Sequence, residues 1–118
     1  MSVSDWQDFI LQTDGRIAEL RGGIPGVAKG FHEVARSAIK AGALDAKTKE
    51  LMALAIGIAA RCDGCLAYHS KAAAKYGATR EEVMETIGVA VYMGGGPSLI
   101  YGAEALSAFD AFAREGEE

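Results

Sequence analysis

The apolar residues of this chain recur mostly at helical spacing. Trp6, Ile10 and Ile17 are an example near the N-terminus, and residues three, four or seven positions apart lie on one face of a helix. Almost no stretch alternates apolar and polar residues with the period of two that a β-strand requires. The pattern therefore predicts an all-α fold, a single domain over residues 1–118 with about six helices.

Glycine, proline and capping residues predict where these helices begin and end. Paired glycines and a proline after residue 21 close an N-terminal helix within residues 1–24, because neither residue continues a helix cheaply. Asp45 and Thr79 are predicted N-caps, Thr79 with Glu82 as a capping box, and Gly77 is a predicted helix stop. In chain order, we expect helices from near residue 4 to 21, over 27–41, over 46–60, from a bend at 61–64 to 76, over 80–93, and over 97–114.

Four of the predicted helices carry apolar surface that should be covered. Residues 51–60 are apolar on all sides, and a helix without a polar face must be surrounded by protein. The second helix is expected to bury Phe31 and Val34. The uncharged window 86–103 is divided by three glycines and Pro97, so we interpret it as two helices that meet at a buried corner rather than as a membrane span. Residues 115–118 are expected to form a frayed acidic tail.

Charge and composition exclude several classes of function. The formal net charge is −4, and no stretch concentrates lysine and arginine, so the basic surface that nucleic-acid binding requires is missing. The N-terminus lacks the basic-then-apolar pattern of a signal peptide, which predicts a cytoplasmic protein. We expect no cofactor and no membrane partner.

The strongest candidate for a reactive site is a C-x-x-C motif followed by a histidine. Cys62 and Cys65 are the two cysteines of the chain, and His69 follows Cys65 by four residues. If a helix starts at Asp63, Cys65 and His69 share one face, where an imidazole can take a thiol proton and leave the reactive thiolate. Cys62 is close enough to form a disulfide with Cys65, so thiol–disulfide chemistry is the favoured interpretation.

Simpler interpretations of these residues stay open. Both cysteines could be small buried hydrophobes, although the polar, flexible pair between them argues against it. A structural zinc site needs four ligands, and Glu50 or His32 would have to join the two cysteines and His69. His69 alone could be a solvated helix residue. Glu50, beside the apolar run, is of interest because a carboxylate near a core needs a partner, and a histidine N–H is a suitable one.

The motif resembles the AhpD-like alkylhydroperoxidases of the carboxymuconolactone decarboxylase superfamily. The similarity lies in Glu50, eleven further residues, and then Cys62-x-x-Cys65-x-x-x-His69. It extends over roughly residues 25–112, including Asp45, the glycine–alanine pair at 77–78 and the glycine run before Pro97.

This resemblance implies an all-helical fold that assembles into homo-oligomers, trimers or hexamers, and reduces hydroperoxides or disulfides. Cys65 would be the peroxidatic cysteine and Cys62 the resolving one, and His69 and Glu50 would form the proton relay. The reductant would be a dithiol donor, either a lipoyl-bearing or a thioredoxin-like protein.

Two other functions remain as alternatives. The chain could be a decarboxylase-type enzyme that uses His69 and Glu50 as acid and base, although the decarboxylase branch of the superfamily lacks the cysteine pair. It could also be a non-enzymatic redox-sensing or metal-binding module.

Overall fold

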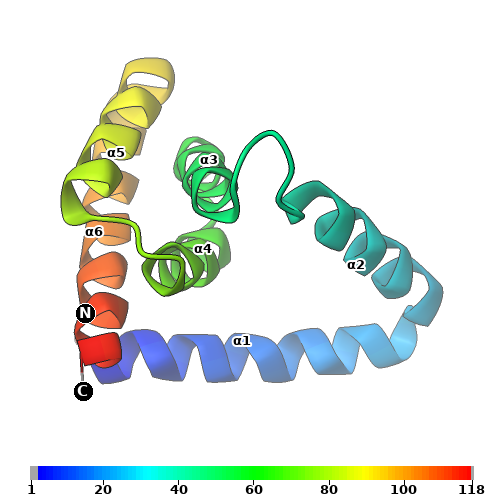
Figure 1. The fold of residues 1–118 in the computed structure, drawn as a ribbon. Helices are drawn as coiled ribbons and strands as arrows, with labels where there is room; N and C mark the ends of the chain where they lie inside the picture. Colours follow the sequence, from blue (N-terminus) through cyan, green and yellow to red (C-terminus); the bar gives the residue numbers. More distant parts are fainter. Residues whose placement is uncertain (1–2, 118) are drawn as a thin grey trace.

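The computed structural model describes residues 3–117, with side chains from residue 5 to 115, and is built from α-helices alone over that range (Figure 1). This confirms the predicted all-α fold. The helices are α1 (Val3–Gly23), α2 (Pro25–Ile39), α3 (Ala46–Ala59), α4 (Asp63–Lys75), α5 (Arg80–Gly94) and α6 (Gly96–Glu117).

The predicted capping residues are where the helices begin and end. The Asp45 side chain accepts the backbone N–H of Thr48 at 2.8 Å and starts α3. Thr79 and Glu82 exchange the two hydrogen bonds of a capping box at the start of α5. Gly77, after α4, has the positive φ of 84° that glycine adopts without strain. Two helices differ in their bounds. Helix α2 covers Pro25–Ile39 instead of 27–41, and α6 continues to Glu117 instead of ending near residue 114, so residues 115–117 prolong the helix. Residue 118 lies outside the described residues.

Two groups of buried side chains form the core. The larger joins α3, α4, α5 and α6 around Leu54, Ile58 and Leu66. The smaller fixes the first half of α1 to α4 and α6, with Trp6 and Ile10 packed against Ala108 and Phe112. The contacts among α3, α4, α5 and α6 hold the α3–α4 turn, which carries both cysteines, against the rest of the molecule.

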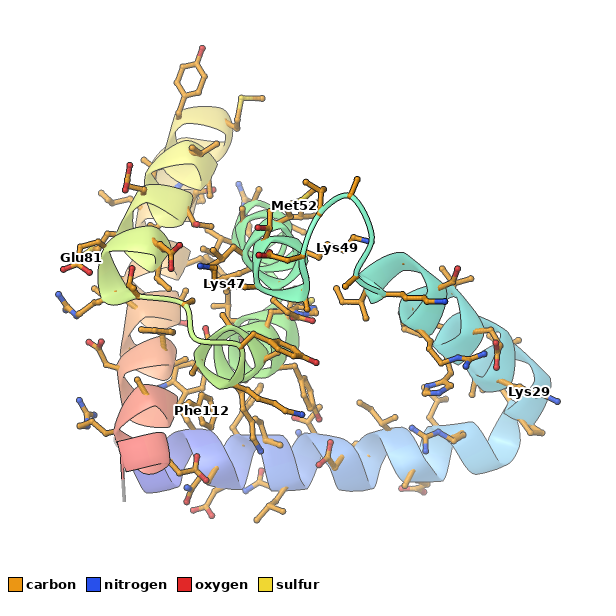
Figure 2. The ribbon with its side chains drawn as sticks, viewed as in Figure 1. Lys29, Lys47, Lys49, Met52, Glu81 and Phe112 are labelled. Atoms are coloured by element: carbon orange, nitrogen blue, oxygen red, sulfur yellow. A yellow bond between two sulfur atoms is a disulfide. The ribbon has the colours of Figure 1, made fainter. Side chains whose placement is uncertain are left out.

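Helix α2 is not buried as predicted. It has no buried residue, and Phe31 is 72% exposed. Figure 1 shows the reason: the second half of α1 carries α2 away from the other helices, so no described part of this chain covers its apolar face. Polar contacts join the end of α2 to α3. The side chain of Lys49 on α3 donates to the backbone oxygens of Ala38 and Lys40 at the end of α2 (Figure 2).

Two further burial predictions were wrong within the single chain. Helix α3 is not surrounded by protein, because Met52 and Ile56 are exposed. The α5–α6 corner is also open, with Tyr92 85% exposed and only Ser98 of its turn buried. Helical periodicity identifies an apolar face but does not identify what covers it. Among the described residues, no helix is long and apolar enough to cross a membrane.

Candidate functional site

The turn between α3 and α4 brings the two cysteines together. Helix α3 ends at Ala59 and α4 begins at Asp63, as the spacing predicted, so Cys62 occupies the N-cap position of α4. Cys62 and Cys65 are joined in a disulfide, with their Cα atoms 5.2 Å apart. The C-x-x-C is therefore an oxidised pair at a helix N-terminus rather than two separately packed small residues.

The turn is a Schellman motif, in which the residues after a helix satisfy its last carbonyl groups. The N–H of Cys62 donates to the oxygen of Gly57 at 3.0 Å, and the N–H of Arg61 donates to the oxygen of Ile58 at 3.1 Å. Arg61 has a φ of 58°, in the left-handed region where this motif normally has glycine. Cys62 thus both completes the end of α3 and starts α4.

The sulfur of Cys62 takes part in this cap. It accepts the backbone N–H of Cys65 at 3.1 Å. The N-terminus of a helix presents unpaired N–H groups and a partial positive charge, which together stabilise a negative charge. Reduction of the disulfide would leave one thiolate where α4 can stabilise it.

His69 and Glu50 form a hydrogen-bonded pair that links α4 to α3. Nδ1 of His69 lies 2.8 Å from Oε2 of Glu50. The Glu50 side chain is 8% exposed and the His69 side chain 32% exposed. Because an ionised carboxylate can only accept, Nδ1 donates to it, and Nε2 is left as the basic nitrogen of the ring. The predicted partnership of Glu50 with a histidine is found in the structure.

This geometry suits proton transfer at a thiol. Cys65 and His69 lie one turn apart on α4, so their side chains leave the same face of the helix. Glu50 fixes the ring from α3, as the carboxylate of a catalytic triad orients its histidine. The four predicted site residues thus come from a single helix–turn–helix unit.

His32 is separate from this group. It lies on α2 and lines a groove of about 1140 Å³ between α1 and α2, together with Phe31 and Tyr68. Among the described residues, no three or more His, Cys, Asp or Glu side chains are arranged to hold a metal ion. His32 is therefore not placed to complete a zinc site with the two cysteines and His69.

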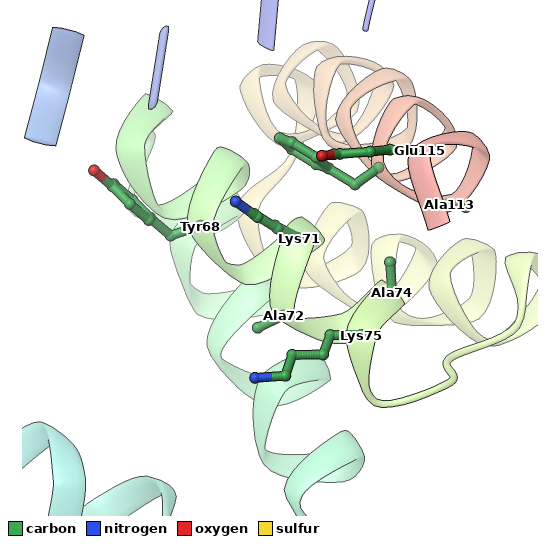
Figure 3. Close-up of a pocket in the computed structure, with 8 residues that line it drawn as sticks. Tyr68, Lys71, Ala72, Ala74, Lys75, Ala113 and Glu115 are labelled. Carbon is green, nitrogen blue, oxygen red and sulfur yellow. The ribbon is translucent and has the colours of Figure 1, made fainter. Parts of the chain in front are cut away.

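A second cavity lies beside the site without containing it. It has a volume of about 550 Å³ between α4 and the end of α6, and Tyr68, Lys71 and Lys75 are among its lining residues (Figure 3). None of the four predicted site residues lines it. The cavity is therefore separate from the group of residues at the α3–α4 turn.

Tyr68 precedes His69 and is held by α1. Burial, the hydrogen bond that Tyr68 donates to Asp14 and the charge of that carboxylate together raise the pKa of Tyr68 to about 12. The phenol therefore stays protonated at neutral pH and cannot act there as a base.

Two residues of the site were not predicted from the sequence. Gly57 contacts Cys65 so closely that a side chain would collide with it, and Arg61 has left-handed backbone geometry. An isolated glycine within an apolar helix is a signal for close packing, but the sequence does not say which residue approaches. Nothing in the residue type of Arg61 indicates its conformation.

Comparisons with known proteins agree with the fold. An apo structure of a carboxymuconolactone decarboxylase family protein from Legionella pneumophila is 48% identical, with a TM-score of 0.88, over 92% of this chain and 97% of that one. A Thermotoga maritima protein of the same family, suggested to take part in the antioxidative response, is 29% identical with a TM-score of 0.81, over 92% of each chain.

A sequence relative and a family model complete the comparison. An uncharacterized protein of Cupriavidus necator is 38% identical over 87 residues, which are 74% of this chain and 77% of that protein. The model of the carboxymuconolactone decarboxylase family matches residues 25–108, a segment that contains all four site residues. The chain belongs to the carboxymuconolactone decarboxylase family.

Proposed function

We propose that this protein reduces hydroperoxides, or disulfides, through Cys65 and Cys62. The observation that carries the proposal is the juxtaposition of a Cys62–Cys65 disulfide with a His69–Glu50 pair on the same two helices. A cysteine pair that forms a disulfide, next to an oriented base, has the parts that thiol-dependent reduction needs. The antioxidative role suggested for the Thermotoga maritima relative agrees with this.

In the proposed reaction, Cys65 is the peroxidatic cysteine. His69 takes the proton of the Cys65 thiol, and the thiolate attacks the terminal oxygen of the hydroperoxide. The O–O bond breaks, Cys65 becomes a sulfenic acid, and the alkoxide leaves as the alcohol after it takes the proton from His69. Glu50 keeps Nε2 of His69 basic and stabilises the imidazolium while it holds that proton.

Cys62 then resolves the sulfenic acid. Its thiol loses its proton, the thiolate attacks the sulfur of Cys65, the S–S bond forms as the S–O bond breaks, and the leaving hydroxide takes up that proton to become water. The hydrogen bond from the Cys65 N–H to the Cys62 sulfur favours the thiolate that this step requires. A dithiol donor, lipoyl-bearing or thioredoxin-like, would return two electrons and two protons to the disulfide and close the cycle.

Thiol counting tests this proposal directly. The reduced protein is treated with a small excess of an organic hydroperoxide, and free thiols and intact mass are measured. We expect two thiols to fall to none, with a mass lower by two hydrogens. Thiols that stay intact at a peroxide concentration that oxidises a small-molecule thiol would overturn the proposal.

The His69–Glu50 hydrogen bond also suits acid–base chemistry without sulfur, which is the decarboxylase-type alternative. The two functions separate in a Cys62→Ser, Cys65→Ser double variant. Loss of the peroxide reaction in this variant is expected under the redox proposal, whereas decarboxylation or isomerisation that persists in it would favour the alternative.

We also propose that the protein works as a homo-oligomer, a trimer or a hexamer. Two exposed apolar surfaces support this. The first, called here the arm patch, consists of Leu20, Val27, Phe31 and Val34 on α1 and α2; the second, the tip patch, consists of Val89, Tyr92, Met93, Leu99 and Ile100 at the α5–α6 corner. Apolar patches of this kind are normally covered by a partner, and two different patches on one chain suit head-to-tail contacts that close into a ring.

A further inference from the structure

We propose that Gly57 is a positioning residue for the cysteine pair, because it holds Cys62 and Cys65 from a single point on α3. This inference rests on the proposed thiol function only in its biological purpose, because the effect of Gly57 on the disulfide does not require that function. The disulfide equilibrium that it concerns can be measured without any peroxide, so the two proposals can fail separately.

The missing side chain of Gly57 makes room for Cys65. A Cβ atom built on Gly57 would lie 2.7 Å from the Cβ of Cys65, well inside the roughly 3.5–4.0 Å at which carbon atoms pack. The backbone of α4 fixes the position of that Cβ, so a change of rotamer cannot relieve the contact. Any residue other than glycine would have to push the first turn of α4 away from α3.

The carbonyl group of Gly57 holds the other cysteine. Its oxygen accepts the N–H of Cys62 at 3.0 Å, which is the longer-range hydrogen bond of the Schellman turn. Cys62 is therefore tied to the backbone of Gly57, while Cys65 rests on the face of Gly57 that has no side chain. Gly57 sets the separation of the two cysteines by this pair of contacts.

A disulfide is sensitive to that separation, because its two Cβ atoms must lie about 3.5–4.5 Å apart. If Gly57 gained a methyl group, Cys65 would move outwards while Cys62 stayed hydrogen-bonded to the Gly57 carbonyl. The oxidised form would bear this strain, whereas two free thiols have no such requirement. The substitution should therefore favour the dithiol over the disulfide.

Other glycines provide the matched comparison. Gly88 lies within α5, is exposed, and has open space where a Cβ would be. Gly88→Ala is thus the same chemical change in a helix without the contact. Gly64 lies between the two cysteines, yet a Cβ there would also meet open space. Closeness to the cysteines in the sequence therefore does not explain the contact at Gly57.

The experiment measures the disulfide equilibrium. Wild-type, Gly57→Ala and Gly88→Ala proteins are equilibrated with mixtures of oxidised and reduced dithiothreitol, and the free thiols are alkylated and counted by mass. For Gly57→Ala we expect the equilibrium constant for disulfide formation to fall at least about tenfold, equivalent to about 30 mV for this two-electron couple. Gly88→Ala should match the wild type. A role in packing alone would destabilise both redox states equally, so an unchanged constant in folded Gly57→Ala would overturn the proposal.

A second variant covers the case in which Gly57→Ala does not fold. Arg61→Val places a β-branched residue in the left-handed region, which it strongly disfavours. Arg61 is exposed, so this substitution does not disturb the core. The strained backbone at residue 61 should weaken the hydrogen bond between the N–H of Cys62 and the oxygen of Gly57. Arg61→Val should lower the same equilibrium constant and Arg61→Gly should not. Equal constants for Arg61→Val and wild type would contradict the proposal.

Discussion

At the scale of single residues, the clearest feature of the site is a buried carboxylate with one identified partner. Burial of an ionised glutamate is unfavourable unless hydrogen bonds compensate for the lost water. Glu50 meets this condition through Nδ1 of His69 at 2.8 Å. A carboxylate at this position makes physical sense if its charge is used, because a neutral amide could hold the same hydrogen bond.

Glu50→Gln tests whether the charge matters. The amide oxygen can still accept from His69, so the ring orientation should survive, but the imidazolium loses its counter-charge. We expect the rate at which hydroperoxide oxidises Cys65 at neutral pH to fall by about 10- to 100-fold, somewhat less than the loss of a whole general base. The decay of free thiols after mixing with peroxide gives this rate.

The pH dependence of the Glu50→Gln defect is part of the same test. The defect should shrink above about pH 9, where an ordinary cysteine is already a thiolate without help. Glu85→Gln is the matched control, since Glu85 is an exposed glutamate on α5. A Glu50→Gln protein that reacts as fast as wild type at neutral pH would show that the carboxylate has no part in the relay.

At the scale of elements, helix ends were more predictable than helix burial. Asp45, Thr79 and Gly77 act on their immediate neighbours in the chain, so their capping roles can be recognised in the sequence. The face of α2 around Phe31 was predicted correctly as apolar but wrongly as buried. What covers a helix face depends on distant or separate chains, and one sequence does not contain that information.

The same distinction applies to the site. The face shared by Cys65 and His69 follows from a spacing of four residues, and the interest of Glu50 follows from the cost of a carboxylate near a core. The contact between Gly57 and Cys65 joins two helices at a crossing point. Its existence depends on how α3 and α4 approach each other, which local spacing does not determine.

The capping box of α5 predicts a pH-dependent contribution to stability. The backbone N–H of Thr79 and the Lys47 ammonium group both lower the pKa of Glu82 below its usual 4.5. A carboxylate whose pKa is lower in the folded state stabilises the fold above its unfolded pKa, and this contribution is lost as the pH falls through the folded value.

Melting temperatures of wild type and Glu82→Gln should therefore differ most near neutral pH. The glutamine can keep the cap but not the charge, so the difference should shrink towards zero as the pH falls below 4.5. Glu85→Gln again serves as the control and should show no such pH-dependent difference from wild type. A wild-type advantage that persists unchanged at low pH would contradict the role of the carboxylate charge.

At the scale of the whole molecule, the arm patch and the tip patch decide how copies could associate. The arm patch lies on α1 and α2, and the tip patch lies at the α5–α6 corner, at different ends of the molecule in Figure 1. If the arm of one copy covers the tip of the next, the interface is heterologous and each subunit has one contact of each kind. Such an assembly would also cover the apolar face of α2 that the single chain leaves open.

This arrangement makes a prediction that an isologous dimer does not. A buried, unpaired carboxylate in an apolar interface is strongly unfavourable, so Phe31→Glu in the arm patch and Ile100→Glu in the tip patch should each give a folded monomer by light scattering, while wild type is a trimer or hexamer. In an equimolar mixture, the intact tip of the Phe31→Glu protein can bind the intact arm of the Ile100→Glu protein, and the chain of contacts then stops. The mixture should therefore contain dimers, with circular dichroism unchanged. A wild-type monomer, or a mixture that stays monomeric, would rule out the contact between arm and tip.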